Sequence, residues 1–412
     1  MGFRHNINLD QMLDDIIKAA EVAEVKYDKQ KIQKVLSAFS DFYSGSAITF
    51  VTSTKPKDAR GLSVRYVELS VPHDPLKIAL ENGIITKDDH PIFEFYPEIH
   101  ATYPMMGYGV DMDANFGLTK IWTFFQIPTP IQKAYHMTHA PDGIRKYADY
   151  FTKYGLEDFS LFALDFKNRT TNIYFMVDDP SRNPPEKVAG MIGDLDFKVP
   201  SEEVLEHCSK AITIYYTFSW DSDIIERVCF GTTALNPGEV PTHLDPLIEK
   251  YVKAAPTLAD KQTFIYSITP SRKGDYIKIE NDYSGSMIEL MTQGANAGIV
   301  LDELKSRVGE SAHEGKELVK TVDWEDGVYE LFENLTAKVP DVFRAMVKPM
   351  LHETAENKCK ERNAGAVSET DLVLALFDIT PEPFKPDAYE NLKAAGIDYQ
   401  KYLELYENSK KV

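Results

Sequence analysis

The sequence has little cysteine: three residues in 412, with no CxxC pair and no clustering of Cys with His. An odd number of thiols (Cys208, Cys229 and Cys359) argues against a disulfide framework, and the lack of clustering argues against a zinc site. This usage is typical of a reducing compartment. A buried structural thiol is the favoured interpretation for each cysteine, and a nucleophile is the alternative.

Long apolar runs and excess positive charge are also missing. No stretch reaches the roughly 18 consecutive apolar residues that a membrane helix requires. The N-terminus MGFRHNINLDQ has no apolar core for export, and Asn6 stands where N-myristoylation needs Ser or Thr. The formal net charge of −19 repels nucleic acid and anionic membranes. We therefore predict a cytoplasmic protein in which an anionic ligand, if there is one, binds in a local basic pocket.

What remains is a globular composition, 43% hydrophobic and 26% charged, with room for two or three domains. Five pairs of strand-like segments follow one another, separated by helical stretches. The pairs are SAITFVTST with GLSVRYVELSVP, EIHATYPMMGYGVD with FGLTKIWTFFQI, SLFALDF with TTNIYFMV, KAITIYYTFSW with IIERVCFGTT, and QTFIYSITPS with DYIKIENDY. About ten antiparallel strands would form a sheet large enough to curl or close.

The predicted strands have one polar and one apolar face, because successive side chains of a strand point to opposite sides. The polar face carries Asn168, Thr170, Asn172 and Tyr174; Thr213, Tyr215 and Thr217; Arg227; Lys278, Glu280 and Asp282; Lys120 and Trp122; Tyr66 and Glu68. Apolar helices must cover the opposite face. The polar face is then the inside of a closed sheet, unlike the apolar interior of a triosephosphate-isomerase barrel.

The polar face brings together three cations from three hairpins, Lys120, Arg227 and Lys278. Arg and Lys with hydroxyl and amide donors suit a phosphate or diphosphate. Aromatic rings beside them could stabilise a carbocation through their negative faces. For any one of these cations, a solvated or ion-paired side chain is the ordinary alternative. Their joint occurrence on one face favours a site.

Several of these segments, taken together and in order, resemble a known family. YGL at 154–156, ALDFKNRTTNIYF, CSKAITIYYTFSW, IIERVCF and DYIKIENDY, in this order, resemble soluble bacterial aromatic prenyltransferases of the ABBA class over roughly residues 10–285. The resemblance implies a PT barrel of repeated α-β-β-α units, a ten-stranded antiparallel barrel with a polar lumen and a ring of helices. This is an α/β fold, or α+β by its strand pairing. It also implies an enzyme of secondary metabolism that transfers a prenyl group, dimethylallyl or geranyl, from an allylic diphosphate to an electron-rich aromatic acceptor.

The resemblance places the family's diphosphate-binding set on matching positions of this chain: Lys120, Asn172, Tyr174, Tyr215, Arg227 and Lys278. Asn168 stands where related enzymes can carry a lysine, so one cation of the set is expected to be absent. Thr213 and Ser160 match positions on the acceptor's side. Glu280 and Asp282 stand where smaller or aromatic groups occur, so acceptor preference is not transferred.

The first hairpin departs from the magnesium-dependent members, because Tyr66 stands where they carry an Asp. We predict that no cofactor and no Mg²⁺ is required, with cationic side chains neutralising the departing diphosphate. Asp111 and Asp113 form a DxD-like pair that could hold a hard cation, although an ordinary acidic turn is favoured. Glu68 and Glu280 are candidates for orienting the acceptor or accepting the proton that the ring loses, or they pair with cations.

The bulk of Trp122 and Phe124 favours the five-carbon dimethylallyl group over geranyl. The expected partners are an allylic diphosphate donor and a small aromatic acceptor, with no nucleic acid and no membrane, in a monomer or homodimer. One alternative is a non-catalytic carrier of an isoprenoid diphosphate or an aromatic metabolite. Another is an enzyme that hydrolyses its donor. A carrier has no need of three cations at one leaving group, which favours the transferase.

The chain continues beyond the resemblance. We predict a PT barrel over residues 1–290 and a helical C-terminal extension over 291–412, with a linker at about 309–321. Ser368 and Asp371 have the spacing of a capping box. The stretch VPDVFRAMVKPMLHETAENKC is faintly similar to the small C-terminal helical domain of a protochlorophyllide reductase subunit. A helical cap or dimerisation module is favoured over a second activity, and packing over metal binding for His352 and Cys359.

Overall fold

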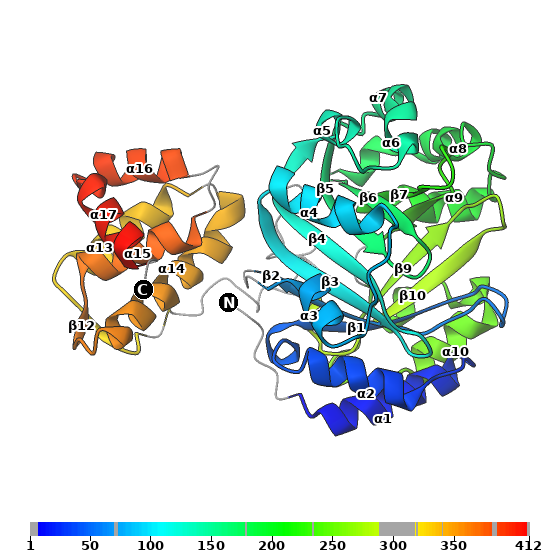
Figure 1. The fold of residues 1–412 in the computed structure, drawn as a ribbon, viewed down its shortest axis with the longest axis horizontal. Helices are drawn as coiled ribbons and strands as arrows, with labels where there is room; N and C mark the ends of the chain where they lie inside the picture. The colour runs from blue at the N-terminus through cyan, green and yellow to red at the C-terminus, as the bar shows by residue number, and fades with distance from the viewer. Residues whose placement is uncertain are drawn as a thin grey trace. The chain divides into compact units, whose positions relative to one another are not determined.

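The computed structural model describes residues 7–69, 73–177, 179–232, 235–287, 318, 320–339, 341–380 and 385–409. The chain splits into two compact units, one within residues 2–300 and the other within 301–412 (Figure 1). The predicted boundary at residue 290 and most of the predicted linker at 309–321 lie outside the described residues. In the part of the chain that is described, no helix is long and apolar enough to span a bilayer.

Ten antiparallel strands of the first unit close into a barrel, because β1 pairs with β10 as well as with β2. The strands are β1 (Ala47–Ser53), β2 (Ser63–Leu69), β3 (Met105–Asp113), β4 (Gly117–Pro130), β5 (Asp158–Asp165), β6 (Thr170–Met176), β7 (Thr213–Ser219), β8 (Arg227–Gly231), β9 (Phe264–Thr269) and β10 (Tyr276–Asp282). Each strand lies beside its neighbours in sequence, so the barrel is a succession of hairpins. The predicted ten-stranded fold is confirmed.

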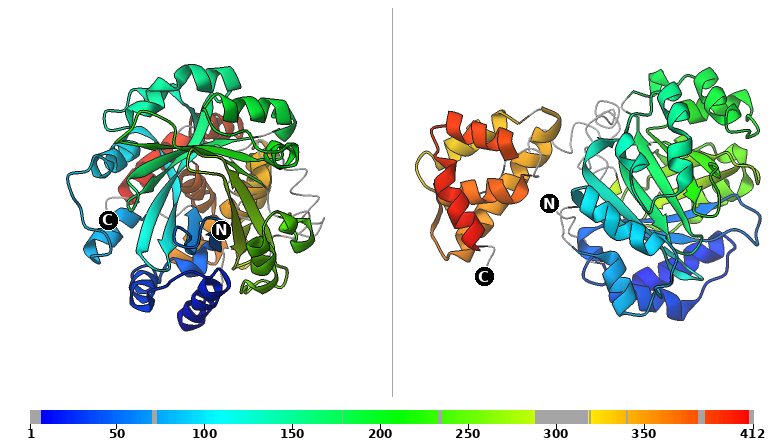
Figure 2. Two further views of the ribbon diagram at one scale, coloured as in Figure 1. Left: turned by 90° about the vertical axis from the view of Figure 1, so that its right-hand side faces the viewer. Right: turned by 45° about the horizontal axis from the view of Figure 1, so that its top comes forward.

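Helices surround the barrel on its outside (Figure 2, left). They are α1 (Leu9–Val22), α2 (Lys29–Ala38), α3 (Pro75–Glu81), α4 (Ile92–Thr102), α5 (Gln132–Tyr135), α6 (Asp142–Lys146), α7 (Ala148–Tyr154), α8 (Pro185–Gly193), α9 (Glu202–Ser209) and α10 (Pro246–Ala254). Side chains of Asn8, Asp28, Asp74 and Asp245 accept hydrogen bonds from the first amides of α1, α2, α3 and α10. These N-caps satisfy donors that a helix start leaves unpaired.

The main core lies between the barrel and these helices. Outward-facing side chains of the strands, such as Ile173, Phe175, Ile214, Tyr216 and Phe218, belong to one buried cluster with the apolar faces of the helices. Because these positions alternate with Asn172, Tyr174, Tyr215 and Thr217, the polar side chains face the lumen. The predicted division between an apolar outside and a polar inside is therefore present in the fold.

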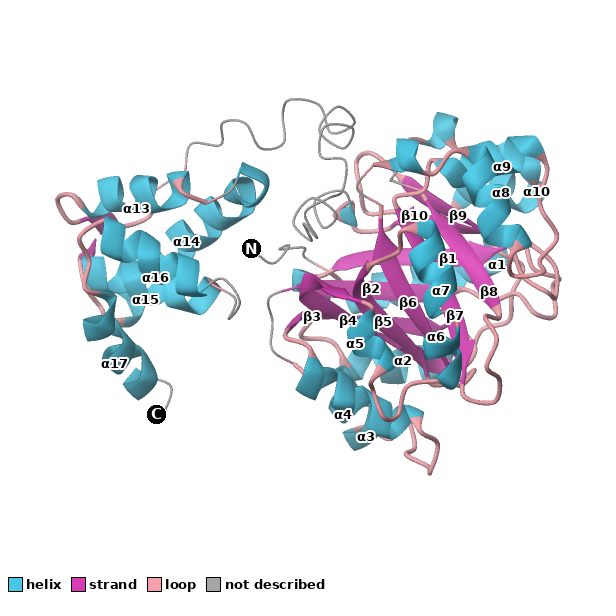
Figure 3. Ribbon diagram, turned by 90° about the horizontal axis from the view of Figure 1, so that it is seen from above, coloured by secondary structure: helices cyan, strands magenta, loops and turns pink. Residues whose placement is uncertain are grey.

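The second unit is mostly helical: α13 (Val328–Ala337), α14 (Asp341–Glu361), α15 (Glu369–Ile379), α16 (Lys385–Ala394) and α17 (Tyr399–Ser409), with a parallel two-residue pair of β11 (Asp323–Trp324) and β12 (Ala366–Val367) (Figure 3). The predicted capping box of Ser368 and Asp371 starts α15. His352 and Cys359 are both buried on α14. The unit has an apolar core of its own.

Candidate active site

Side-chain contacts between neighbouring strands fix which side chains face inward. Thr49 Oγ1 on β1 donates to Glu280 Oε1 on β10 at 2.7 Å, and Arg65 Nη1 on β2 donates to Glu280 Oε2 at 2.8 Å. Inward positions then repeat at every second residue of each strand. The sequence-predicted residues Lys120, Trp122, Asn172, Tyr174, Thr213, Tyr215, Arg227, Lys278 and Glu280 share this inner face.

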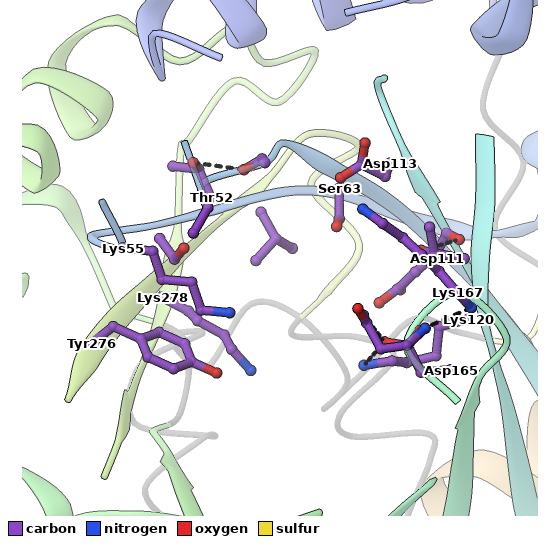
Figure 4. Close-up of a pocket in the computed structure, with 16 residues that line it drawn as sticks. Thr52, Lys55, Ser63, Asp111, Asp113, Lys120, Asp165, Lys167, Tyr276 and Lys278 are labelled. Atoms are coloured by element: carbon purple, nitrogen blue, oxygen red, sulfur yellow. Dashed lines mark hydrogen bonds and ion pairs between the residues drawn. The ribbon is translucent and has the colours of Figure 1, made fainter. Parts of the chain in front are cut away.

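A cavity of about 220 Å³ opens at the end of the barrel where the hairpin turns lie. Figure 4 shows its two walls: Lys55, Tyr276 and Lys278 on one side, and Asp111, Lys120, Asp165 and Lys167 facing them. Backbone and hydroxyl groups of Thr52, Ser53, Ser63 and Thr119 complete the lining. The cavity is therefore rich in cations and small polar groups, which is the character of an oxyanion site.

On one wall the cations have no carboxylate partner among the described residues. Lys278 Nζ donates a hydrogen bond to the Tyr215 hydroxyl, and Lys55 Nζ lies 4.3 Å from the centre of the Tyr276 ring. Burial lowers the pKa of Lys278, and the nearby Arg227 lowers it further. Burial likewise lowers the pKa of Lys55. Arg227 Nε is buried and finds no hydrogen-bond partner in the described part of the chain. Unpaired buried cations are costly, so this wall is prepared for an anion.

On the facing wall the cations are ion-paired. Arg65 Nε lies 2.7 Å from Asp111 Oδ1, and the same guanidinium binds Glu280. Lys120 Nζ lies 3.8 Å from Asp165 Oδ2. Burial lowers the pKa of Lys120 even though Asp165 and Asp111 act to raise it. The two walls thus differ in available charge, although each carries basic side chains.

An aromatic section follows the cavity along the lumen. The Tyr174 and Tyr215 rings stack with centres 4.4 Å apart, and Trp122 lies 4.8 Å from Tyr174. The Arg65 guanidinium lies 4.2 Å from the Trp122 ring. On β3, a Cβ at Gly109 would come within 3.2 Å of Trp122, so glycine leaves the space that the indole fills. This section offers π-faces to a cation formed next to the basic cavity.

Apolar side chains close in beyond the aromatic section. Ala47, Val67 and Met287 form a small cluster, with Leu69, Phe124 and Ile265 packed against it. Along its length, the lumen therefore changes from basic through aromatic to apolar. A molecule with a charged head and a hydrocarbon tail matches this order.

Asp282 and Ser160, two residues predicted to bind the substrate, differ in what they contact in the structure. The Asp282 carboxylate accepts backbone hydrogen bonds from Gly285, Ser286 and Met287, so it holds the turn after β10 and is not available to a substrate. Burial raises its pKa to about 6. Ser160 is fully buried on β5, next to an irregularity in the β4–β5 pairing, and its hydroxyl has no hydrogen-bond partner among the described residues.

The prediction that Tyr66 and Glu68 face the lumen is wrong. On β2 the inward positions are Ser63, Arg65 and Val67, since Arg65 binds the inward-facing Glu280 over the intervening strand β1. Tyr66 packs outward against the ring of Tyr43, with centres 5.4 Å apart. Glu68 is buried on the same outer side, where its carboxylate lies 3.8 Å from His73. Glu68 therefore leaves the set of catalytic candidates.

Residues missed by the sequence analysis complete the site. Arg65 and Lys55 were not among the candidates, yet Arg65 lies on the inner face of β2 and binds Glu280, and Lys55 lines the cavity. The position of Asn168 brings no lysine, but Lys167 beside it lines the cavity, with Nζ 3.2 Å from the centre of the Phe116 ring. Arg65 is adjacent to Tyr66 on a predicted strand, so the assignment of Tyr66 to the inner face placed Arg65 on the outer one. Lys55 lies outside any strand, where alternation says nothing.

Asp111 and Asp113, for which an ordinary acidic turn was favoured over a metal site, belong to the end of β3 and line the cavity. Asp111 binds Arg65, and Asp113 accepts hydrogen bonds from the amides of Asn115 and Phe116. Among the described residues, no group of three or more His, Cys, Asp or Glu side chains is arranged to hold a metal ion. Both carboxylates thus have partners within the protein.

Comparison with known proteins supplies the remaining evidence. The profile of the family described as aromatic prenyltransferase Orf2 matches residues 7–295. The 5,10-dihydrophenazine-1-carboxylate 9-dimethylallyltransferase of Streptomyces anulatus is 31% identical over 295 residues, covering 70% of this chain and 98% of that one. The flaviolin linalyltransferase of Streptomyces virginiae is 27% identical, covering 65% and 89%. Among solved structures, the 5-dimethylallyl tryptophan synthase from Streptomyces coelicolor, in complex with DMASPP and Trp, is 10% identical with a TM-score of 0.40, covering 67% and 94%.

Proposed function

This chain belongs to the aromatic prenyltransferase Orf2 family, and from that premise we propose how its barrel carries out the reaction. The protein is an aromatic prenyltransferase, which joins a prenyl group from a diphosphate donor to an aromatic acceptor. The observation that carries the assignment of roles is the wall of unpaired cations, Lys55, Arg227 and Lys278, directly before the stacked rings of Tyr174 and Tyr215.

The donor's diphosphate binds in the basic cavity. Lys55, Arg227 and Lys278 contact its oxygens from one wall, Lys120 does so from the other, and Tyr215 donates its hydroxyl proton. The catalytic contribution of these groups is electrostatic, because negative charge grows on the diphosphate as the carbon–oxygen bond breaks. Asn172 on β6 lies opposite Ala163, the β5 partner of Trp122, and its side-chain oxygen accepts a hydrogen bond from the Thr217 hydroxyl at 2.7 Å. This bond fixes the Asn172 amide, whose NH₂ group donates one hydrogen bond to the Tyr174 hydroxyl at 3.4 Å and has a second N–H for the donor.

The allyl group then lies in the aromatic section, where Trp122, Tyr174 and Tyr215 face the cation and exclude water. The π-electrons of the acceptor ring attack the allylic carbon and form the new bond, while the carbon–oxygen electron pair leaves with diphosphate. A proton is then lost from the ring carbon. Glu280 faces this section and accepts that proton or orients an acceptor hydroxyl, with Arg65 and Thr49 holding its carboxylate in place.

The reaction needs no Mg²⁺ in this proposal. Basic side chains gather at the diphosphate site: Lys55, Lys120, Lys167 and Lys278 line the cavity, and Arg65 and Arg227 lie on the inner face of neighbouring strands. Their combined charge does what a metal ion otherwise does at a departing diphosphate. Full activity in excess EDTA would support this part of the proposal, and recovery of activity only on adding Mg²⁺ would refute it.

The donor and acceptor classes follow from the lumen and the relatives. Trp122 and Phe124, with ring centres 6.2 Å apart, narrow the section beyond the cavity and favour a dimethylallyl donor. The Streptomyces anulatus enzyme acts on 5,10-dihydrophenazine-1-carboxylate and the Streptomyces virginiae enzyme on flaviolin. An acceptor of similar fused-ring type is proposed here, in a cytoplasmic enzyme that is a monomer or homodimer. Light scattering of the purified chain would decide the oligomeric state.

The test is an incubation with dimethylallyl or geranyl diphosphate, a panel of phenazine, naphthalenediol and phenolic acceptors, and EDTA throughout. Mass spectrometry then detects products that are heavier by one prenyl group. The Arg227→Ala protein serves as the negative control, and Lys57→Ala, which alters an exposed lysine paired with Glu24, as the matched positive control. Donor bound intact with no prenylated acceptor across the panel would count against the transfer mechanism.

A further inference from the structure

We propose that Arg60 is a positioning residue for the donor site, which holds the β1–β2 connection (residues 54–62) so that the Lys55 ammonium stays over the diphosphate. The inference rests on the proposed role of Lys55 in donor binding. Arg60 itself does not line the cavity, whereas Lys55, Ala59 and Gly61 of the same connection do. Its effect on the reaction must therefore pass through the backbone that carries Lys55.

The guanidinium of Arg60 ties two parts of the chain together. Its Nε donates to the carbonyl oxygen of Lys55 at 3.1 Å, and its Nη1 donates to the carbonyl oxygen of Ala23 at 3.2 Å. Ala23 is the C-cap of α1. The last carbonyls of a helix lack partners within the helix and carry partial negative charge, so a cation binds well there. Because the guanidinium is a rigid planar fork, the two bonds fix the Lys55 backbone relative to α1.

The beginning and end of the connection are held independently of Arg60. Thr54 N donates to the Ile277 carbonyl at 2.9 Å, and Ile277 N donates to Thr54 Oγ1 at 2.9 Å, which joins the start to β10. Thr52 Oγ1 donates to the Gly61 carbonyl at 3.0 Å, which holds the end. Loss of Arg60 would then release the middle of the connection without detaching either strand.

Lys55 needs such a hold because its neighbours repel it. Burial lowers its pKa, and the charges of Arg227, Lys278 and Lys120 act in the same direction. In the free enzyme these like charges disfavour an inward ammonium, whereas the Tyr276 ring, with its centre 4.3 Å away, favours it. A long lysine side chain also loses rotamer freedom when it is fixed inward. An anchored backbone reduces the number of conformations in which Lys55 points away, so the donor finds the cation already in place.

The experiment measures steady-state kinetics for Arg60→Ala, Lys55→Ala, the double variant and Lys57→Ala, each with donor and acceptor varied separately. Competition by inorganic diphosphate is measured in the same proteins. We expect Arg60→Ala to raise the donor KM and the diphosphate inhibition constant by roughly tenfold, about the effect of one hydrogen bond to a charged group. The acceptor KM should stay within about twofold of the unaltered protein. Lys57, on the same connection but paired with Glu24 at the surface, is the control for charge.

The double variant makes the proposal specific. If Arg60 acts through Lys55, adding Arg60→Ala to the Lys55→Ala protein should raise the donor KM little further, since the two coupled residues contribute to the same effect. Arg60→Lys, which keeps the charge but loses the fork, should have an intermediate donor KM. Effects that multiply in the double variant, or a fall in kcat and melting temperature with the donor KM unchanged, would overturn the proposal.

Failure of this inference can be told apart from failure of the proposed function. If Lys55→Ala and Arg60→Ala leave the donor KM unchanged while Arg227→Ala and Lys278→Ala abolish transfer, the positioning role is wrong and the diphosphate site stands. If none of the four variants affects the donor, the site itself has been placed wrongly.

Discussion

Replacing Arg65 with Met tests whether the ion pairs on the inner wall of the barrel stabilise the fold. Methionine keeps an apolar stem of similar length but removes the guanidinium, which leaves Asp111 and Glu280 without their shared partner. The side chains of Asp111 and Glu280 are only 7% and 11% exposed. Removing one partner of a buried ion pair destabilises proteins by about 3–5 kcal/mol, because the remaining charge is left uncompensated in a poorly solvated site.

That energy converts into a readily measured change in melting temperature. At about 2–4 °C per kcal/mol for a domain of roughly this size, Arg65→Met should lower the melting temperature of the barrel by about 6–20 °C. Lys120 near Asp111 and water in the adjoining cavity would partly compensate the remaining charges. The fall in melting temperature should therefore lie toward the smaller value. The lost contact between Arg65 and the Trp122 ring adds about 0.5–2 kcal/mol in the other direction.

Calorimetry of the full chain is the appropriate assay, because the helical unit and the barrel have separate cores and can melt separately. The matched variant is Arg65→Met combined with Asp111→Asn and Glu280→Gln, which removes the two uncompensated charges and should recover part of the lost stability. A single Arg65→Met variant that melts within about 2 °C of the unaltered protein would refute the ion-pair reasoning. So would a triple variant that is no more stable than the single one.

Three further predictions concern other parts of the barrel. Burial raises the pKa of the Glu68 carboxyl to about 7. Below the ordinary pKa of a glutamate the buried carboxyl is neutral and costs the fold no stability, and this stability is lost as the carboxyl ionises while pH rises through 7. In urea unfolding, the Glu68→Gln protein should therefore be more stable than the unaltered protein by about 1–3 kcal/mol at pH 8 and equally stable at pH 4. Its kcat should be unchanged, and a loss of prenyl transfer would contradict the outward placement of Glu68. Because burial lowers the pKa of Lys120 and Lys278, both should lose their charge, and the donor KM should rise, at a pH below the value of about 10.4 at which ordinary lysines titrate. Lys278→Arg should move that rise to higher pH. A donor KM that does not change with pH would argue against a role of both lysines in donor binding. A Cβ at residue 231 would lie 2.5 Å from Oγ1 of Thr213, a predicted acceptor residue, so Gly231→Ala should raise the acceptor KM and leave the donor KM unchanged. Adding Thr213→Ser to Gly231→Ala should not relieve the clash, because serine keeps the oxygen. Adding Thr213→Ala should relieve it.

The fold was largely predictable because alternation is a strong signal where one face is uniformly apolar. On β6 and β7, the inward Asn172, Tyr174, Tyr215 and Thr217 alternate with Ile173, Phe175, Tyr216 and Phe218. Most of the diphosphate-binding set lies on such strands. On β2 the signal fails, because Val67 is apolar but faces inward while Glu68 is polar but faces outward. A prediction that follows polarity therefore assigns the wrong face, and only the contact between Arg65 and Glu280 corrects it.

The remaining site residues could not be predicted from periodicity, for different physical reasons. Lys55 lies in a connection, and its inward direction depends on the backbone bonds that Arg60 makes. Asp282 has the inward position expected of it, but the tight turn after β10 brings three amides onto its carboxylate. Ser160 adjoins an irregular pairing between β4 and β5, where counting by two loses its meaning.

The charge distribution of the lumen explains how a chain with a net charge of −19 can bind a diphosphate. The carboxylates on the inner face are not spread evenly: Asp111, Asp165 and Glu280 all lie beside Arg65 or Lys120. Lys55, Arg227 and Lys278 have no such partner among the described residues, and burial lowers the pKa of the two lysines. In the empty enzyme this wall therefore carries uncompensated positive charge at a cost in stability. A bound diphosphate compensates that charge, and the interaction grows stronger as the carbon–oxygen bond breaks and the leaving group gains negative charge. The paired wall fixes the geometry of the lumen, and the unpaired wall is free to stabilise the departing diphosphate.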